Sequence, residues 1–344
     1  MVKRRLFISI LAVSLACLAG AESKPAKAKT PSRSRVIQVQ ETDAVQTFVP
    51  QADKAKVMVA RAITQLTGKT NAADAWKAIV SPKDKVGIKV HCAPGPTSGT
   101  RAVVVGAVIE GLLSAGLKPG QIIVWDRKME DLRAANYGEL EHRYGIRLAS
   151  STEAGYDEKA FYDTSLLGNL VYGDLEFGKK GDGIGRKSYV SKLVTRELTK
   201  IISITPLLNH NQVGVTGHLY GLTQGSVDNF LRFDVSTDRL ATAVPEIYAL
   251  PELSDRLVLA IVDALICQYH GEERGLLHYS TVLNQLWFSK DPVALDVLGI
   301  QELEKQRKIL GLPLAKPKME LYENATLLEL GQHEPRLMQV ETPR

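Results

Sequence analysis

Cysteine is scarce in this sequence, with three among 344 residues. Cys17 lies in an apolar segment near the start, which leaves only Cys92 and Cys267 in the body of the chain. Iron–sulfur clusters are normally held by four cysteine thiolates, so no iron–sulfur cluster is expected. The remaining pair could form a disulfide, stay as two free thiols or bind a metal, and their spacing does not decide between these states.

Long apolar runs and an excess of one charge are missing too. The apolar run of residues 6–18 is shorter than a membrane-spanning helix, so no membrane span is expected in the mature chain. Lys and Arg total 43 against 38 Asp and Glu, and removal of residues 1–21 would take away three basic residues, leaving 40 against 38. A nucleic-acid surface needs basic residues concentrated on one face, so no nucleic-acid partner is expected.

The first 35 residues have the composition of an export segment followed by a tether. A basic start, "KRR", precedes the apolar run, and "AGA" follows it, which predicts a secretory signal peptide over residues 1–21 and a periplasmic or secreted mature chain. The stretch "RRLFI" also resembles a twin-arginine signal, so the general and twin-arginine routes both stay open. A lipoprotein anchor at Cys17 is disfavoured because Ser14 stands where an aliphatic residue is expected. Residues 22–35 are predicted to be a disordered tether.

Apolar strand-like runs alternate with helical periodicity through the rest of the chain. Residues 85–92 and 121–126 are predicted strands with a helix over 100–116 between them, which is the pattern of a parallel crossover. We therefore predict one α/β domain over residues 36–330, with a mainly parallel central sheet flanked by helices. Further expected features are helices over 53–68 and 291–311, buried strands in "KIISITP", "DRLVLAIVDA" and "VLNQLWFS", a β-hairpin insertion at about 168–194, and a C-terminal tail over 331–344.

Polar side chains follow nearly every predicted strand. Ligands of open parallel sheets bind beyond the carboxyl ends of the strands, where such groups converge. The stretch "NHNQVGVTG" is the most unusual of these ends, because its glycines permit close approach of the backbone to a ligand. We expect a polar crevice at this edge that includes Lys89, His91, Cys92, Asp126, Asn209, His210, Asn211, Thr216, Gly217, Asp263 and Asp291.

Six stretches of the chain, taken in order, resemble the domain-of-unknown-function 362 family. They are "KVGIKVH", "TRAVVVGAVIEGLLSAG", "IIVWD", "ISITPLLNHNQVGVTGHLYGLTQGSVDN", "IVDAL…HG" and "FSKDPVALDVLG". The resemblance runs from about Lys85 to Pro313 and is most specific in "HNQVGVTG" and "DPVALD". It implies an α/β fold and export, which is common among members. Some members carry a ferredoxin-like module, for which this chain lacks the cysteines. Many members also have a lysine two residues before a histidine ahead of Gly-Val-Thr, and this chain has none there.

Three hypotheses for the crevice stay open. Cys92, Cys267 and His270 could hold a metal, since Cys267 and His270 have ligand-like spacing. Acid–base chemistry on a small anionic substrate would use Lys89 to hold the anion, His210 to transfer protons and Asp263 to orient the imidazole. His91, Asn209, Asn211, Thr216, Gly217 and Asp291 would then bind the ligand. Alternatively the chain is an exported binding or accessory protein without turnover. The cofactor and the oligomeric state are not fixed by the sequence.

Overall fold

One large sheet organises the residues that this computed structural model describes, 33–164 and 185–343. Its strands follow the order β13-β1-β12-β11-β9-β4-β5-β6, and the short β10 pairs with β9. Every pairing is parallel except those that include β12 or β10. The mainly parallel α/β sheet expected from the sequence is confirmed. The strands are β1 (Ser34–Gln40), β4 (Val86–Lys89), β5 (Ile122–Asp126), β6 (Arg147–Ser150), β9 (Lys200–His210), β10 (Gly214–Val215), β11 (Leu257–Gln268), β12 (Ser280–Ser289) and β13 (Met338–Glu341).

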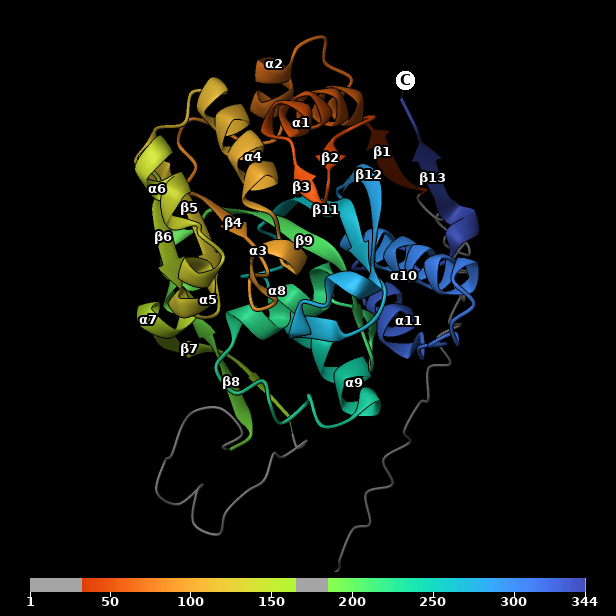
Figure 1. The fold of residues 1–344 in the computed structure, drawn as a ribbon. Coiled ribbons are helices and arrows are strands. Elements are labelled where there is room, and N and C mark those ends of the chain that lie inside the picture. Colours follow the sequence, from red (N-terminus) through yellow and green to blue (C-terminus); the bar gives the residue numbers. More distant parts are fainter. Residues whose placement is uncertain (1–32, 165–184, 344) are drawn as a thin grey trace, which may run out of the picture. The chain divides into compact units, whose positions relative to one another are not determined.

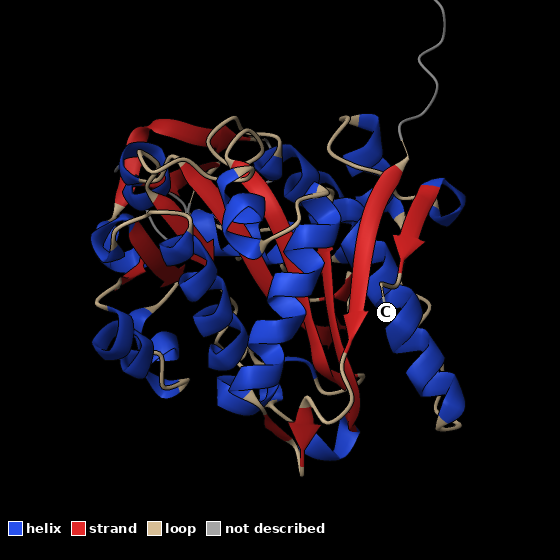
Figure 2. Ribbon diagram, turned by 90° about the horizontal axis from the view of Figure 1, so that it is seen from above, coloured by secondary structure: helices blue, strands red, loops and turns tan. Residues whose placement is uncertain are grey.

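Helices cover both faces of this sheet (Figure 1, Figure 2), and each face has its own apolar core. The first face packs against α1 (Ala52–Thr67), α2 (Ala72–Lys77), α4 (Ala102–Ser114), α5 (Met129–Ala134) and α6 (Gly138–Tyr144). The second face packs against α8 (His218–Ser226), α9 (Thr237–Tyr248), α10 (Pro292–Ile309) and α11 (Glu320–Leu327). Short helices lie in the connections: α3 (Gly95–Ser98), α7 (Ser151–Ala154), η1 (Pro119–Gln121), η2 (Leu193–Glu197), η3 (Glu272–Arg274), η4 (Leu277–Tyr279) and η5 (Pro335–Leu337).

The parallel crossover read from the sequence is present as β4, α4 and β5. Val86 to Lys89 pair in register with Ile122 to Trp125. α4 is almost wholly apolar, and its residues from Val104 to Ile109 are all buried because α1 and α2 cover the side that the sheet does not. This crossover brings the carboxyl ends of β4 and β5 to the same edge, and β9, which pairs with β4 in parallel up to Ser203, continues beyond them to His210.

The predicted hairpin insertion is an antiparallel pair, and its first strand lies earlier than expected. β7 (Tyr156–Asp163) pairs with β8 (Lys187–Ser191), so the first strand ends before residue 168. Most of the segment between them, residues 165–184, lies outside the described residues. A second small antiparallel pair joins β2 (Val45–Gln46) to β3 (Val49–Pro50).

The sheet extends beyond the expected domain limits of 36 and 330. β1 begins at Ser34, within the segment predicted as tether, and β13 lies within the predicted tail. The two strands pair in parallel, and Arg35 forms an ion pair with Glu341 at 2.7 Å. β13 is a short, polar edge strand, and β1, which lies between β13 and β12, has its apolar residues Val36, Ile37 and Val39 interrupted by polar ones, so neither strand has the long apolar run by which buried strands are found. Among residues 33–164 and 185–343, no helix has the length and apolarity needed to cross a membrane.

Candidate functional site

A cavity of about 270 Å³ opens at the carboxyl edge of the parallel strands. β4 and β5 contribute residues that directly follow them, α8 contributes one wall, and the η3 loop closes another side. This position agrees with the edge at which ligands of open parallel sheets bind. The polar residues that line it include His91, Asp126, Arg127, Tyr220, Asp234 and Glu273.

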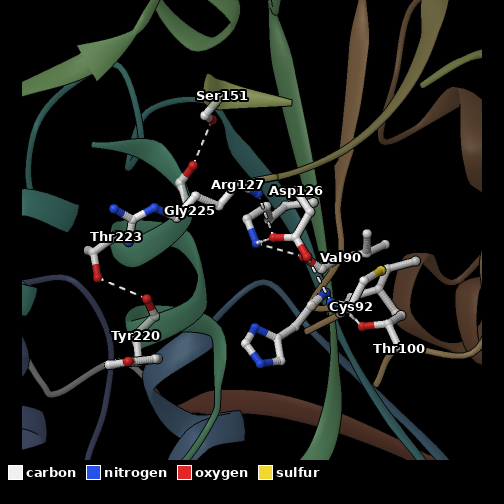
Figure 3. A network of polar contacts seen from close by, with 12 residues as sticks. Val90, Cys92, Thr100, Asp126, Arg127, Ser151, Tyr220, Thr223 and Gly225 are labelled. Carbon is white, nitrogen blue, oxygen red and sulfur yellow. Dashed lines mark hydrogen bonds and ion pairs between the residues drawn. The ribbon is translucent and has the colours of Figure 1, made fainter. Parts of the chain in front are cut away.

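A buried ion pair between Lys89 and Asp126 lies beneath this cleft. Lys89 Nζ is 2.8 Å from Asp126 Oδ1, and both side chains are almost fully buried, with 1% and 4% exposed. Figure 3 shows Asp126 turned toward the main chain of Cys92, whose N–H donates to Asp126 Oδ2 at 2.7 Å. The main-chain N–H of Arg127 donates to Asp126 Oδ1. Lys89 therefore neutralises Asp126 and is not free to hold an anionic substrate as the sequence suggested.

Helix α8 seals Lys89 from the cleft. A Cβ atom on Gly225 would lie 2.1 Å from Lys89 Cε, so only glycine permits this approach without a shift. Ser151 Oγ donates to the carbonyl of Gly225 at 2.7 Å, which ties the end of the helix to α7 (Figure 3). The end of α8 is thereby fixed over β4.

His91 brings a buried imidazole to the cleft. Its side chain is 2% exposed, and its main-chain N–H donates to Thr100 Oγ1. His91 Nε2 lies 3.1 Å from Glu273 Oε1, which is close enough for an ion pair, but the two groups are not aligned for a hydrogen bond. Contact with His91 lowers the pKa of the Glu273 carboxyl. The Glu273 side chain is 45% exposed and has room to change conformation, whereas the buried His91 imidazole does not.

The two asparagines of "NHN" hold the loop that carries Glu273. The main-chain N–H of Glu272 donates to Asn209 Oδ1 at 3.1 Å, and the Asn211 N–H donates to Glu272 Oε1 at 2.7 Å. Gln268 adds a bond from its side-chain amide to the carbonyl of Glu272. Asn209 is buried and Asn211 is exposed, and neither lines the cavity. Their contacts position η3, and the expected direct role of Asn209 and Asn211 at the cavity is not seen.

His210 lies beside the cleft with its Nδ1 already occupied. The main-chain N–H groups of Gln212 and Val213 point at Nδ1 from 3.2 and 3.4 Å. Two donors at one ring nitrogen require that it carry no proton, so the neutral ring is protonated at Nε2. Burial lowers the pKa of His210, which favours the same neutral form. His210 is thus a hydrogen-bond donor, and the predicted role in proton transfer does not fit its geometry.

Tyr220 links His210 to an acidic residue of the cleft. Its ring lies 4.4 Å from the His210 ring, centroid to centroid, and its hydroxyl donates to Asp234 Oδ2 at 3.3 Å. Burial raises the pKa of both Tyr220 and Asp234.

Thr216 and Gly217 lie in the interior, where α8 begins against α10. A Cβ atom on Gly217 would be 2.2 Å from Asp296 Oδ1. The carboxylate of Asp296 accepts the main-chain N–H groups of His218 and Leu219, at 2.7 and 3.0 Å. The glycine predicted to approach a ligand instead approaches a carboxylate of the protein.

Asp263 does not orient His210. It is fully buried and paired with Arg101, whose Nη1 lies 3.1 Å from Oδ1 and whose main-chain N–H donates to Oδ2. Asp263 therefore anchors the start of α4, and the predicted His210–Asp263 pair is wrong.

Asp291 lies at the opposite edge of the sheet. β12 runs antiparallel to β11, so its end points away from the cleft. Asp291 instead accepts the N–H of Ala294 at the start of α10, the N–H of Gln332 and the hydroxyl of Ser34.

The structure does not bring Cys92, Cys267 and His270 together as metal ligands. Cys92 packs in the core of the first face and Cys267 in that of the second, and both thiols are free. Burial raises the pKa of both thiols, which opposes the thiolate that metals bind. His270 packs against the Tyr279 ring. In the described ranges there is no group of three or more His, Cys, Asp or Glu residues that could hold a metal ion.

Sequence reasoning missed Tyr220, Asp234 and Glu273. Tyr220 lies inside an apolar helix, and Asp234 lies in an irregular segment between α8 and α9. Glu273 had a usable signal, because "HGEE" directly follows the carboxyl end of β11.

Comparisons with known proteins identify a family without an assigned activity. A family model described as domain of unknown function (DUF362) matches residues 86–301. No curated protein matches the chain significantly. Among solved structures, a crystal structure of a Thermotoga maritima protein, from the Northeast Structural Genomics Consortium, is similar at 11% identity with a TM-score of 0.42. The match covers 78% of this chain and 61% of that one, so this chain spans less than two thirds of that protein's length.

Proposed function

The chain belongs to the family of domain of unknown function DUF362, and we propose that it is an enzyme that moves protons on a small polar molecule bound in this cleft. The observation that supports the proposal most strongly is the burial of the His91 imidazole at the wall of the cavity. The imidazole is 2% exposed, lines the cavity and has a carboxylate at 3.1 Å. Buried imidazoles normally make a hydrogen bond, and among the described residues His91 Nε2 has only the ion-pair contact with Glu273, without the alignment of a hydrogen bond.

The proposed roles follow from the two imidazoles. His91 accepts a proton from the substrate at Nε2, and the negative charge of Glu273 stabilises the imidazolium that forms. The same nitrogen then returns the proton to the substrate. His210 donates a hydrogen bond from Nε2 and keeps its own protonation state, because two main-chain N–H groups occupy Nδ1.

We further propose that the chain is exported and acts outside the cytoplasm. The support is the basic, apolar and small-residue pattern of residues 1–21. N-terminal sequencing of protein recovered from a Gram-negative expression host should begin near Glu22, and an intact Met1 on cytoplasmic protein would contradict export.

Deuterium incorporation tests the proposed chemistry while the substrate is still unidentified. The purified protein is incubated in D₂O with a mixture of small polar metabolites, and mass spectrometry follows compounds that gain a deuteron at carbon. We expect at least one compound to gain deuterium with the wild type and not with His91→Gln. His270→Gln is the matched control, because His270 packs on Tyr279 and does not line the cavity. If one compound binds but nothing exchanges, the chain is a binding protein and the enzymatic proposal is wrong.

A further inference from the structure

Three carboxylates line the cleft and outnumber its cations. Asp131, Asp234 and Glu273 all line the cavity. The Asp131 side chain makes no hydrogen bond or ion pair with any residue in 33–164 or 185–343. Asp234 Oδ1 is buried and likewise has no hydrogen-bond partner within those ranges, while Oδ2 receives only the Tyr220 hydroxyl.

The cations of the cleft are mostly engaged elsewhere. Lys89 pairs with Asp126. Arg127 is buried, and its guanidinium donates to the carbonyl of Asp228 at 3.1 Å. Lys128 is exposed at the rim. If the imidazoles are neutral, Arg127 and Lys128 contribute two positive charges against three negative ones from Asp131, Asp234 and Glu273.

His91 provides independent evidence that the cleft is built for a ligand. It is nine-tenths buried or more, it lines the same cavity, and its Nε2 lacks a hydrogen-bond partner within the described part of the chain. The close neighbour of this nitrogen is the half-exposed carboxylate of Glu273 at 3.1 Å, which makes no aligned hydrogen bond with it, and a buried polar atom left in this state costs free energy unless another molecule supplies the hydrogen bond.

We propose that the cleft binds a small organic molecule through a protonated amine held by Asp131, Asp234 and Glu273. This inference rests on the proposed function, for which it names the substrate class. Leu231 lines the same cavity with 48% of its surface exposed, and it offers an apolar contact for the carbon chain of the amine. Burial and neighbouring carboxylates raise the pKa of Asp131 and Asp234, which is the electrostatic situation that a bound cation relieves.

Small molecules of equal chain length can show whether the cleft binds an ammonium group or a carboxylate group. Isothermal titration compares 1,4-diaminobutane, 4-aminobutanoate and succinate, which share a four-carbon chain and differ in their end groups. MgCl₂ and CaCl₂ test for a metal ion at the same carboxylates. We expect saturable binding of both amines and none of succinate or the metal ions.

Three substitutions locate the binding. Asp131→Asn and Glu273→Gln should each weaken amine binding by about tenfold or more, because each removes one charge-assisted hydrogen bond. The Asp131 side chain has no partner to lose, so its substitution leaves the fold intact. Asp255→Asn is the matched control, since Asp255 is exposed just before the amino end of β11, at the opposite edge.

Each binding result either supports the amine site or overturns it. Binding of succinate, absence of amine binding, or amine binding unchanged in Asp131→Asn and Glu273→Gln would overturn it. Saturable Mg²⁺ or Ca²⁺ binding that the same two substitutions abolish would overturn it in favour of a metal site. His91→Gln should retain amine binding within about threefold, because the carboxylates remain. Loss of deuterium exchange in that variant therefore reports on the proposed function separately.

Discussion

At the scale of single residues, a buried ion pair lies beneath the cleft, and Lys89 is its cation. Its Nζ contacts Asp126 Oδ1 and the carbonyl of Val90, and α8 covers it. The role of Lys89 is therefore to neutralise Asp126, whose carboxylate in turn orients the main chain that carries Cys92 and Arg127.

Lys89→Met tests this role through stability. Removal of one partner from a buried ion pair leaves the other charge uncompensated, so the free energy of unfolding should fall by about 3–5 kcal/mol. Urea denaturation measures the change. Lys128→Met is the control, because Lys128 is exposed and its loss should change the stability by less than about 0.5 kcal/mol. Equal effects of the two substitutions would show that Lys89 is not paired as described.

Among the elements, helix α8 connects the interior to the cleft. Asp296 of α10 holds its first turn, Tyr220 lines the cavity, and Gly225 lies over Lys89. Because one short helix makes all three contacts, a change at either end is expected to move Tyr220.

Two glycines of α8 give a matched pair of substitutions. Gly225→Ala places a methyl group 2.1 Å from Lys89 Cε, and such overpacking costs about 1–3 kcal/mol. Gly221→Ala meets only Thr205 Cγ2 at 3.7 Å, so the better helix propensity of alanine should stabilise the protein by about 0.5–1 kcal/mol. Thermal unfolding of the two variants should move in opposite directions. A stabilising Gly225→Ala would contradict the packing of α8 over Lys89.

The start of α8 should make stability depend on pH. Burial raises the pKa of Asp296 to about 7 from an ordinary value of 3.8. The protonated form is favoured by folding, so this contribution to stability is fully present below about pH 3.8 and is lost as pH rises through about 7. Burial also lowers the pKa of His218 to about 3. The neutral form is therefore favoured by folding, and its contribution to stability is fully present above about pH 6.5 and is lost as pH falls through about 3.

The Asp296→Asn variant isolates the first of these effects, because both proteins retain His218. At pH 5 the variant should be less stable than the wild type by about 1–3 kcal/mol, since the NH₂ of the carboxamide cannot accept a buried main-chain N–H, whereas the hydroxyl oxygen of the protonated carboxyl group can. The difference should shrink toward pH 8, where the wild type carries a buried charge. Denaturation by urea at both pH values measures it, and a difference that does not change with pH would rule out titration of Asp296.

At the scale of the whole molecule, the N- and C-terminal ends of the described chain close one edge of the sheet. β13 pairs with β1, and Gln332 donates its main-chain N–H to Asp291. Deletion of residues 332–344 should lower the melting temperature by several degrees, at about 2–4 °C per kcal/mol lost. Deletion of residues 342–344 alone removes only residues beyond β13 and should leave the melting temperature unchanged. Equal melting temperatures for both deletions and the full chain would show that β13 does not contribute to the stability of the sheet.

The sequence predicted those parts of the fold that have strong periodicity. The crossover from β4 to β5 could be predicted because apolar strands and a helix alternate there. The direction of β12 could not be predicted, because a parallel and an antiparallel strand can have the same apolar run. Asp291 was placed at the wrong edge for that reason.

The candidate site was predicted less completely than the fold. His91 was expected at the cleft and lines it, and His210 adjoins it through Tyr220. Asp263 pairs with Arg101 because the Asp263 side chain faces the first core, whereas His210 packs beside Tyr220 on the other side of the sheet. Such pairings depend on which face a side chain takes and on distant loops, neither of which short sequence patterns encode.

In the proposed mechanism the cleft moves protons through His91, whereas His210 only donates a hydrogen bond. The rate of deuterium incorporation into the substrate, compared between His91→Gln and His210→Gln, tests it most directly. His91→Gln should lower the rate by about 10²–10⁴-fold, because it removes the proton acceptor. His210→Gln should stay within about tenfold of the wild type, since a carboxamide can accept the two main-chain N–H groups and still donate a hydrogen bond. The reverse pattern, with exchange lost in His210→Gln and retained in His91→Gln, would contradict this assignment.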